Sequence, residues 1–298
     1  MKKVLLSLFF FIGMSLFANE VTVSILPQKY FVEKIAKDKV KVNAMVQPGF
    51  SPATYEPKVS QMRELTKSSI YFSIDVPFEN VWLEKFKNAN KNMIVVDTAD
   101  GIEKLAMAEH NHEEEMKHDE HEHHKGDHES HDTHKHEGLD PHIWLDPILV
   151  KTQAKNIYEA LVKYDEKNAS FYKTNYESFL VELDELNKKI HEILEPYEHK
   201  EFMVFHPSWG YFAKRYHLEQ LAIEVQGKEP KPNELVEIMD DAKKHNIKIV
   251  FVSPQFSQKS AKTISKNINA TVAVINPLSY NWDEELIKSA TKIANSYK

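Results

Sequence analysis

DEKNASFYKTNYESFLVELDELNKKIHEIL, residues 165–194, is the longest helical pattern in the sequence. Its apolar residues recur at steps of three and four, which predicts one buried face along a helix that Pro196 ends. About thirty helical residues would extend roughly 45 Å, longer than a small domain requires. Such a helix could be a coiled-coil dimer arm. We favour a strut between two lobes, because strand and helix patterns alternate on both sides of it.

Short apolar runs alternate with amphipathic segments before and after this helix. The expected strands are residues 21–25, 40–46, 70–74 and 93–96, then 202–205, 221–225, 247–252 and 271–275. The expected helices are residues 28–37, 57–68, 77–88 and 147–163, then 209–216, 233–245, 257–267 and 283–297. This alternation predicts an α/β fold with mainly parallel sheets. We expect an N-terminal lobe over 19–164, a linking helix over 165–195 and a C-terminal lobe over 196–298.

The first residues, MKKVLLSLFFFIGMSLFA, have a charged start and an apolar run over 4–17. This pattern is typical of a secretory signal peptide, which we expect to be cut after Ala18. An uncleaved anchor is the alternative, but the run is short for a membrane-spanning helix. We therefore expect a protein exported to a bacterial periplasm.

The composition excludes several classes of function. The chain has no cysteine, which rules out disulfides and thiolate metal sites. It has seven glycines and no glycine-rich phosphate loop, which argues against an ATPase or a dinucleotide enzyme. The net charge of −7 comes from residues 109–138, which contain eleven acidic residues and three lysines. The sequence has no basic patch of the kind that would indicate nucleic-acid binding.

Residues 109–138 also contain ten histidines, between His110 and His136. A stretch with so few apolar residues cannot offset the entropy of ordering, so we expect a disordered loop. Neutral imidazole suits zinc, copper and nickel, which predicts metal binding. A solubilising acidic segment is the alternative interpretation.

Four motifs resemble one known family along essentially the whole mature chain. They are GFSP (49–52) with YEP (55–57), DPHIWLDP (140–147), FHPSWGYF (205–212) and FVSPQFS (251–257). The family is the zinc/manganese solute-binding proteins of ABC importers, also called cluster A-I or cluster 9. The resemblance implies two (β/α)4 lobes joined by a long rigid helix, with metal bound in the cleft between them. It also implies that a His-rich acidic loop is typical of zinc members.

The resemblance places two metal-ligating histidines at His142 and His206. Manganese-type relatives tend to carry a carboxylate at the second position, so the histidine favours zinc. Glu224, at the end of a predicted strand, is a candidate to hold an imidazole tautomer, although structural pairing is equally consistent. Binding needs neutral imidazoles, so zinc affinity should fall below a pH of about 6.5.

Two positions depart from the family pattern. Ala53 stands where the family has its first histidine, and Asn276 stands where many members have an aspartate ligand. Zinc usually has four ligands, at least three of them from protein. The predicted metal site is therefore His142, His206 and Asn276, with Glu56, Asp283, water or a loop histidine as further candidates. A loop histidine is attractive because the loop ends a few residues from His142.

The resemblance implies a zinc receptor that works with a membrane permease and a separate ATPase. We expect a monomer that is not an enzyme, with Zn(II) as the transported ligand. An exported zinc hydrolase is the main alternative, but there is no His-Glu-x-x-His motif and no obvious general base. A metal buffer or adhesin without a transport role is a second alternative.

Overall fold

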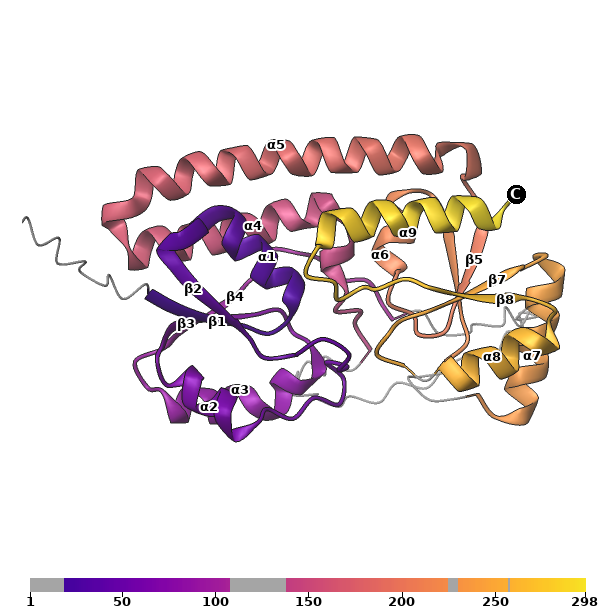
Figure 1. Ribbon diagram of the computed structural model, residues 1–298, viewed down its shortest axis with the longest axis horizontal. Helices are drawn as coiled ribbons and strands as arrows, with labels where there is room; N and C mark the ends of the chain where they lie inside the picture. Colours follow the sequence, from indigo (N-terminus) through magenta and orange to yellow (C-terminus); the bar gives the residue numbers. More distant parts are fainter. Residues whose placement is uncertain (1–18, 108–137, 225–229, 257) are drawn as a thin grey trace, which may run out of the picture.

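The computed structural model describes residues 19–107, 138–224, 230–256 and 258–298 (Figure 1). The predicted signal peptide and nearly all of the predicted His-rich loop lie outside these ranges. Within them, no helix is both long enough and apolar enough to cross a membrane.

The N-terminal sheet is entirely parallel, with the strand order β2-β1-β3-β4. Its strands are β1 (Asn19–Val23), β2 (Val40–Ala44), β3 (Ser68–Ser73) and β4 (Ile94–Asp97). The helices of this half are α1 (Leu26–Ala36), α2 (Val59–Leu65), α3 (Pro77–Ala89) and α4 (Pro147–Tyr164). Alternation of buried strands with amphipathic helices produces this arrangement, because each crossover helix covers a face of the sheet.

The C-terminal sheet is also parallel and repeats the same order, β6-β5-β7-β8. Its strands are β5 (Glu201–Val204), β6 (Glu219–Ala222), β7 (Ile249–Val252) and β8 (Thr271–Val274). Its helices are α6 (Gly210–Arg215), α7 (Pro232–Lys244), α8 (Gln258–Asn267) and α9 (Trp282–Ser296). The predicted α/β class with two mainly parallel lobes is confirmed. In each sheet the order reverses at the first strand, where open α/β sheets place ligands.

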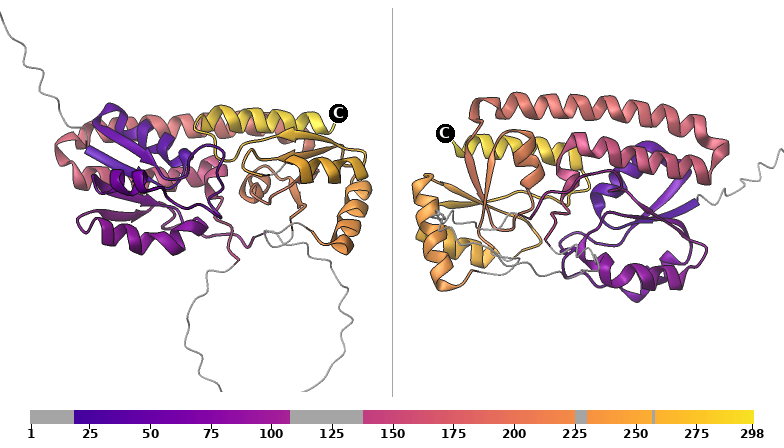
Figure 2. Two further views of the ribbon diagram at one scale, coloured as in Figure 1. Left: turned by 60° about the horizontal axis from the view of Figure 1, so that its bottom comes forward. Right: turned by 180° about the vertical axis from the view of Figure 1, so that it is seen from behind.

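The long helix α5 spans Ala169–Leu194 and lies along both lobes (Figures 1 and 2). Its buried face is the predicted apolar stripe, including Tyr172, Phe179, Leu183, Leu186, Ile190 and Leu194. The helix begins four residues later than expected. Asp165 instead ends α4 and accepts hydrogen bonds from Asn168 Nδ2 and Tyr172 Oη, which form a short turn before α5.

One apolar core continues from the N-terminal lobe through α5 into α9. Trp282, at the start of α9, packs edge-on against Phe31 of α1 with ring centroids 4.9 Å apart. A second core, under α7 and α8, belongs to the C-terminal lobe alone. The lobes are therefore packed together on the α5 side, and the DPHIWLDP segment crosses between them.

Two tryptophans fix that crossing. Trp144 donates its indole N–H to the carbonyl of Pro277 at 2.6 Å, and Trp282 donates its indole N–H to the carbonyl of Trp144 at 2.8 Å. Both rings are fully or almost fully buried. Since Trp144 lies two residues after His142, these bonds position the predicted ligand against the C-terminal lobe.

Candidate metal centre

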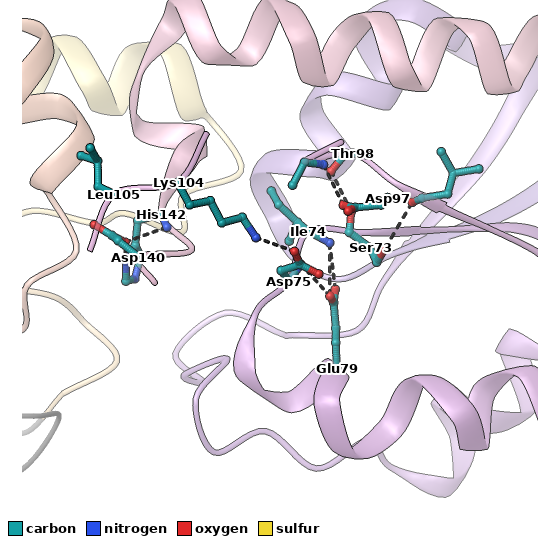
Figure 3. Close-up of polar contacts among 12 residues, drawn as sticks. Ser73, Ile74, Asp75, Glu79, Asp97, Thr98, Lys104, Leu105, Asp140 and His142 are labelled. Atoms are coloured by element: carbon teal, nitrogen blue, oxygen red, sulfur yellow. Dashed lines mark hydrogen bonds and ion pairs between the residues drawn. The ribbon is translucent and has the colours of Figure 1, made fainter. Parts of the chain in front are cut away.

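His142 is held by the aspartate that precedes it by two residues. Asp140 Oδ1 accepts from the backbone N–H of His142 at 2.9 Å and lies 2.7 Å from its Nδ1 (Figure 3). Asp140 is itself 2% exposed. With the Nδ1 proton donated to this carboxylate, Nε2 keeps a free lone pair for a metal ion.

The imidazole of His206, in the C-terminal lobe, is also held by a carboxylate. It follows β5 closely, at the reversal of strand order, and its Nδ1 lies 2.6 Å from Glu224 Oε2. Glu224 is brought there because the Ile223 and Glu224 N–H groups bond to the carbonyls of Val204 and Phe205, which continues the pairing beyond β6. Glu224 thus contacts the imidazole, as the sequence suggested it could.

Burial sets the protonation of His206. It lowers the pKa of the imidazole below its usual value, more strongly than the Glu224 hydrogen bond raises it. The ring also stacks on Phe256, with centroids 4.6 Å apart. The neutral form, which binds metal, is therefore favoured to a lower pH than in free histidine.

The two imidazoles face each other across the lobes. Their ring centroids are 5.5 Å apart and their planes are inclined at 72°. Zinc–nitrogen bonds of 2.0–2.1 Å in tetrahedral geometry place two ligating imidazoles with centroids about 5 Å apart. The spacing of the two ring centroids is therefore close to that of two imidazoles bound to one ion.

A cavity of about 700 Å³ contains both histidines and is lined by both lobes. The N-terminal lobe contributes Ala53 and Asp75 among others, and the C-terminal lobe contributes Ser208 and Gln255. Asp75 is paired with Lys104 at this side of the cleft (Figure 3). The cavity is larger than one ion needs.

The other predicted or candidate ligands are placed differently. Asn276 Oδ1 accepts from Gln255 Nε2 at 3.0 Å and from the Leu278 N–H at 3.1 Å, and Asn276 is not among the residues lining the cavity. Glu56 and Asp283 do not line it either. Within the described ranges, no group of three or more His, Cys, Asp or Glu side chains could hold a metal. The structure thus brings together two of the three predicted ligands.

Asp140 is a residue of the candidate site that the sequence did not single out. Its spacing in Asp-Pro-His was the available signal, since a carboxylate two residues before a ligating histidine can reach back to the ring. Tyr211, in the FHPSWGYF motif, contacts the same segment. Its hydroxyl donates to the Asp140 carbonyl at 2.8 Å and accepts from the Leu105 N–H at 2.9 Å, which fixes the segment before His142.

A family model described as ZnuA, zinc-uptake complex component A periplasmic, matches residues 21–295. The chain belongs to the ZnuA family. It is 30% identical over 265 residues to the high-affinity zinc uptake system protein ZnuA of Bacillus subtilis (strain 168), covering 87% of this chain and 78% of that protein.

Solved structures of the ZnuA family agree with the fold. A crystal structure of ZnuA is 42% identical, with a TM-score of 0.82, covering 94% of this chain and all of that chain. The structure of a ZnuA deletion mutant with zinc bound is 41% identical, also with a TM-score of 0.82, covering 94% of this chain and 98% of that one.

Proposed function

We propose that this ZnuA-family chain is the receptor of an ABC importer, which captures Zn(II) in the cleft between its lobes and delivers it to a membrane permease. The observation that carries the proposal is the pair of imidazoles from opposite lobes, spaced for one ion. Membership of a zinc-uptake family and the names of the relatives support it. The periplasmic location, the cleavable signal peptide, the lobe boundaries and the monomeric state belong to the proposal.

The proposed ligand set of His142, His206 and Asn276 is supported unequally. Each histidine is turned by a buried carboxylate so that Nε2 is available. Asn276 Oδ1 already accepts two hydrogen bonds, which oppose a ligand role in this conformation. An Asn276→Ala variant should therefore change zinc affinity much less than a change at either histidine.

The cavity does not support the hydrolase alternative. A zinc hydrolase needs a general base beside the metal-bound water. Asp140 and Glu224 are both engaged by imidazole Nδ1 atoms, and Asp75, the carboxylate among the described lining residues, is paired with Lys104. Capture without turnover fits this arrangement.

The test is zinc affinity measured by competition with a chromophoric chelator strong enough to suppress weak sites. His142→Ala and His206→Ala should each lower the affinity at least about 100-fold, because each removes a ligand from an incomplete set. His191→Ala is the matched control, since His191 is exposed on α5. Unchanged affinity in both variants would refute the proposed site.

Delivery needs a separate test in a host that lacks its own zinc importer. The chain, expressed with its permease and ATPase, should restore growth under zinc limitation, and His206→Ala should not. Equal rescue by the wild type and His206→Ala would contradict a role for the cleft in transport.

A further inference from the structure

We infer that Phe256 sets the rate at which zinc leaves the cleft, because its ring holds the His206 imidazole in place and His206 is the ligand that dissociates first. This inference rests on the proposed function and adds a positioning residue to the proposed site. It is carried by the stacking of the two rings and by a difference in how the two proposed histidine ligands are anchored.

The ring of Phe256 lies against one face of the His206 imidazole. The two ring centroids are 4.6 Å apart and the planes are inclined at 24°. Stacking at this spacing is a favourable geometry for an aromatic pair. Glu224 holds the same imidazole at Nδ1, at 2.6 Å. The His206 ring is therefore restrained at one nitrogen and on one face, and both restraints come from the C-terminal lobe.

His142 is anchored in the core that runs through both lobes. Trp144, two residues later, is fully buried, and its indole N–H bonds to the carbonyl of Pro277 in the other lobe. Tyr211 of that lobe donates to the carbonyl of Asp140. Trp144 and Tyr211 are both members of the shared core. Moving His142 away from a bound ion would therefore disturb packing between the lobes.

His206 is anchored in the core that belongs to the C-terminal lobe alone. Phe205 and Ile223 are members of this second core, and the half-buried Phe256 packs against it. Phe256 lies in the turn that follows β7, where its N–H donates to the carbonyl of Ser253 at 3.1 Å. Turns are more mobile than the packed elements that they connect. The His206 side of the proposed site is therefore the less rigid side.

This asymmetry predicts the order of release. An ion held by ligands from both lobes leaves one ligand at a time, and the less firmly anchored ligand dissociates first. Phe256 lines the cavity beside His206 and occupies the space on one face of the imidazole. Removing the ring gives the imidazole room to rotate away from the ion. The loss of pre-organisation should therefore speed release, while the open cavity still admits the ion.

The experiment measures zinc release from the full mature chain by stopped flow. The chain is loaded with substoichiometric zinc, so that the tightest site fills, and is then mixed with an excess of a chromophoric chelator. Phe256→Ala should release zinc roughly 2–12-fold faster than the wild type, the range that the strength of one aromatic pair allows. Its association rate should stay within about twofold of the wild type, because most changes at one interface act on dissociation. An unchanged release rate would overturn the inference.

Two further substitutions separate stacking from packing. Phe256→Tyr keeps the flat ring and should release zinc at the wild-type rate. Phe256→Leu keeps apolar packing but has no ring, and it should release zinc about as fast as Phe256→Ala. Phe50→Ala is the matched control, since Phe50 is 49% exposed and lies beside Ser51, which lines the cavity. Wild-type release from Phe256→Leu, or equally fast release from Phe50→Ala, would overturn the role of the stacked ring.

A double-mutant cycle on zinc affinity shows which imidazole Phe256 acts through. Phe256→Ala and Glu224→Gln remove two restraints on one ring, so their combined loss should differ from the product of the single losses by more than about twofold. Phe256→Ala and Asp140→Asn act on different rings and should combine as the simple product. A purely structural role of Phe256 would not produce this difference. Equal coupling of Phe256 to Glu224 and to Asp140, or coupling to neither, would overturn the inference.

Two outcomes separate this inference from the proposed function. If His206→Ala binds zinc as tightly as the wild type, the proposed function fails and the inference fails with it. If His206→Ala loses affinity while Phe256→Ala releases zinc at the wild-type rate, the proposed function stands and the inference alone is refuted.

Discussion

Arg215 of α6 binds both oxygens of Asp146, the residue that caps α4. Its Nε lies 2.9 Å from each oxygen, and its Nη2 lies 2.8 Å from Oδ2. Asp146 Oδ1 also accepts from the Ile148 N–H at 2.8 Å, at the first turn of α4. Asp146 is 4% exposed, so this ion pair joins the start of a helix in one lobe to a helix of the other in a largely buried setting.

Arg215→Ala should lower the free energy of unfolding by about 2–3 kcal/mol, because it leaves a buried carboxylate without its cation. This loss lies at or below the lower end of the usual range of about 3–5 kcal/mol, since the arginine side chain is 35% exposed and solvent screens the pair. Arg215→Lys should retain only part of the stabilisation that Arg215 provides, because an ammonium group cannot bind both carboxylate oxygens in the same way. Urea denaturation measures the effect. Lys214→Ala, at the exposed neighbour, is the control and should match the wild type.

Glu224→Gln should weaken zinc binding roughly 10–100-fold, the usual cost of losing a carboxylate that orients a ligating imidazole. Glutamine can accept a hydrogen bond from Nδ1 but lacks the charge that raises the basicity of the ring. The control is Glu219→Gln, at the exposed start of β6. Chelator competition measures both, and the same affinity in the two variants would show that Glu224 has only a structural role.

Gly210→Ala should also weaken zinc binding, although Gly210 is not one of the proposed ligands. A Cβ at this position would lie 2.9 Å from Asp140 Oδ2, so the carboxylate or α6 must shift. Because Asp140 positions His142, we expect a loss of roughly tenfold. The loss should be non-additive with Asp140→Asn in a double-mutant cycle. Additive losses would mean that Gly210 acts by another route.

Glu79 predicts a pH dependence of stability. Burial raises its pKa to about 8, although Ser24 Oγ donates to the carboxyl group. The N–H groups of Ile74 and Asp75 also donate to it (Figure 3). Between the ordinary value of 4.5 and about 8, the folded chain holds a proton that the unfolded chain releases. Glu79 therefore makes the free energy of unfolding fall as pH rises through this window, by up to about 1.4 kcal/mol per pH unit.

Glu79→Gln should remove this contribution. Relative to the wild type, the variant should gain stability steadily from pH 5 to pH 8 in urea titrations. Glu84→Gln, at an exposed position of the same helix, is the matched control and should follow the wild type. Parallel curves for the wild type and Glu79→Gln would contradict a raised pKa.

The fold could be predicted because its determinants are local. Helical stripes and short apolar strands repeat within a few residues, so every expected strand and helix had a counterpart, with ends displaced by a few residues. The predicted start of α5 was four residues too early, because Asp165 accepts hydrogen bonds from Asn168 and Tyr172 instead of continuing the helix. A competing side-chain hydrogen bond of this kind is not visible in an apolar pattern.

The site was predictable only in part. His142 and His206 were predicted as ligands from their motifs, and the structure brings their ring centroids to 5.5 Å from each other. The sequence could not show that Asn276 Oδ1 is already hydrogen-bonded. One donor is Gln255, 21 residues earlier in the chain, and the other is the Leu278 N–H. Contacts between separate strand ends arise from the assembled sheet and leave no periodic trace in the sequence.

The apolar core that passes from α1 through α5 to α9 makes the two lobes a single cooperative unit. Separating them would expose Phe31 and Trp282 to water, and would leave the indole N–H of Trp144 without its acceptor. Heat should therefore melt both lobes in one calorimetric transition, whose van't Hoff and calorimetric enthalpies agree. An ion bound between His142 and His206 would then raise the melting temperature of the whole chain, including the distant ends of α5.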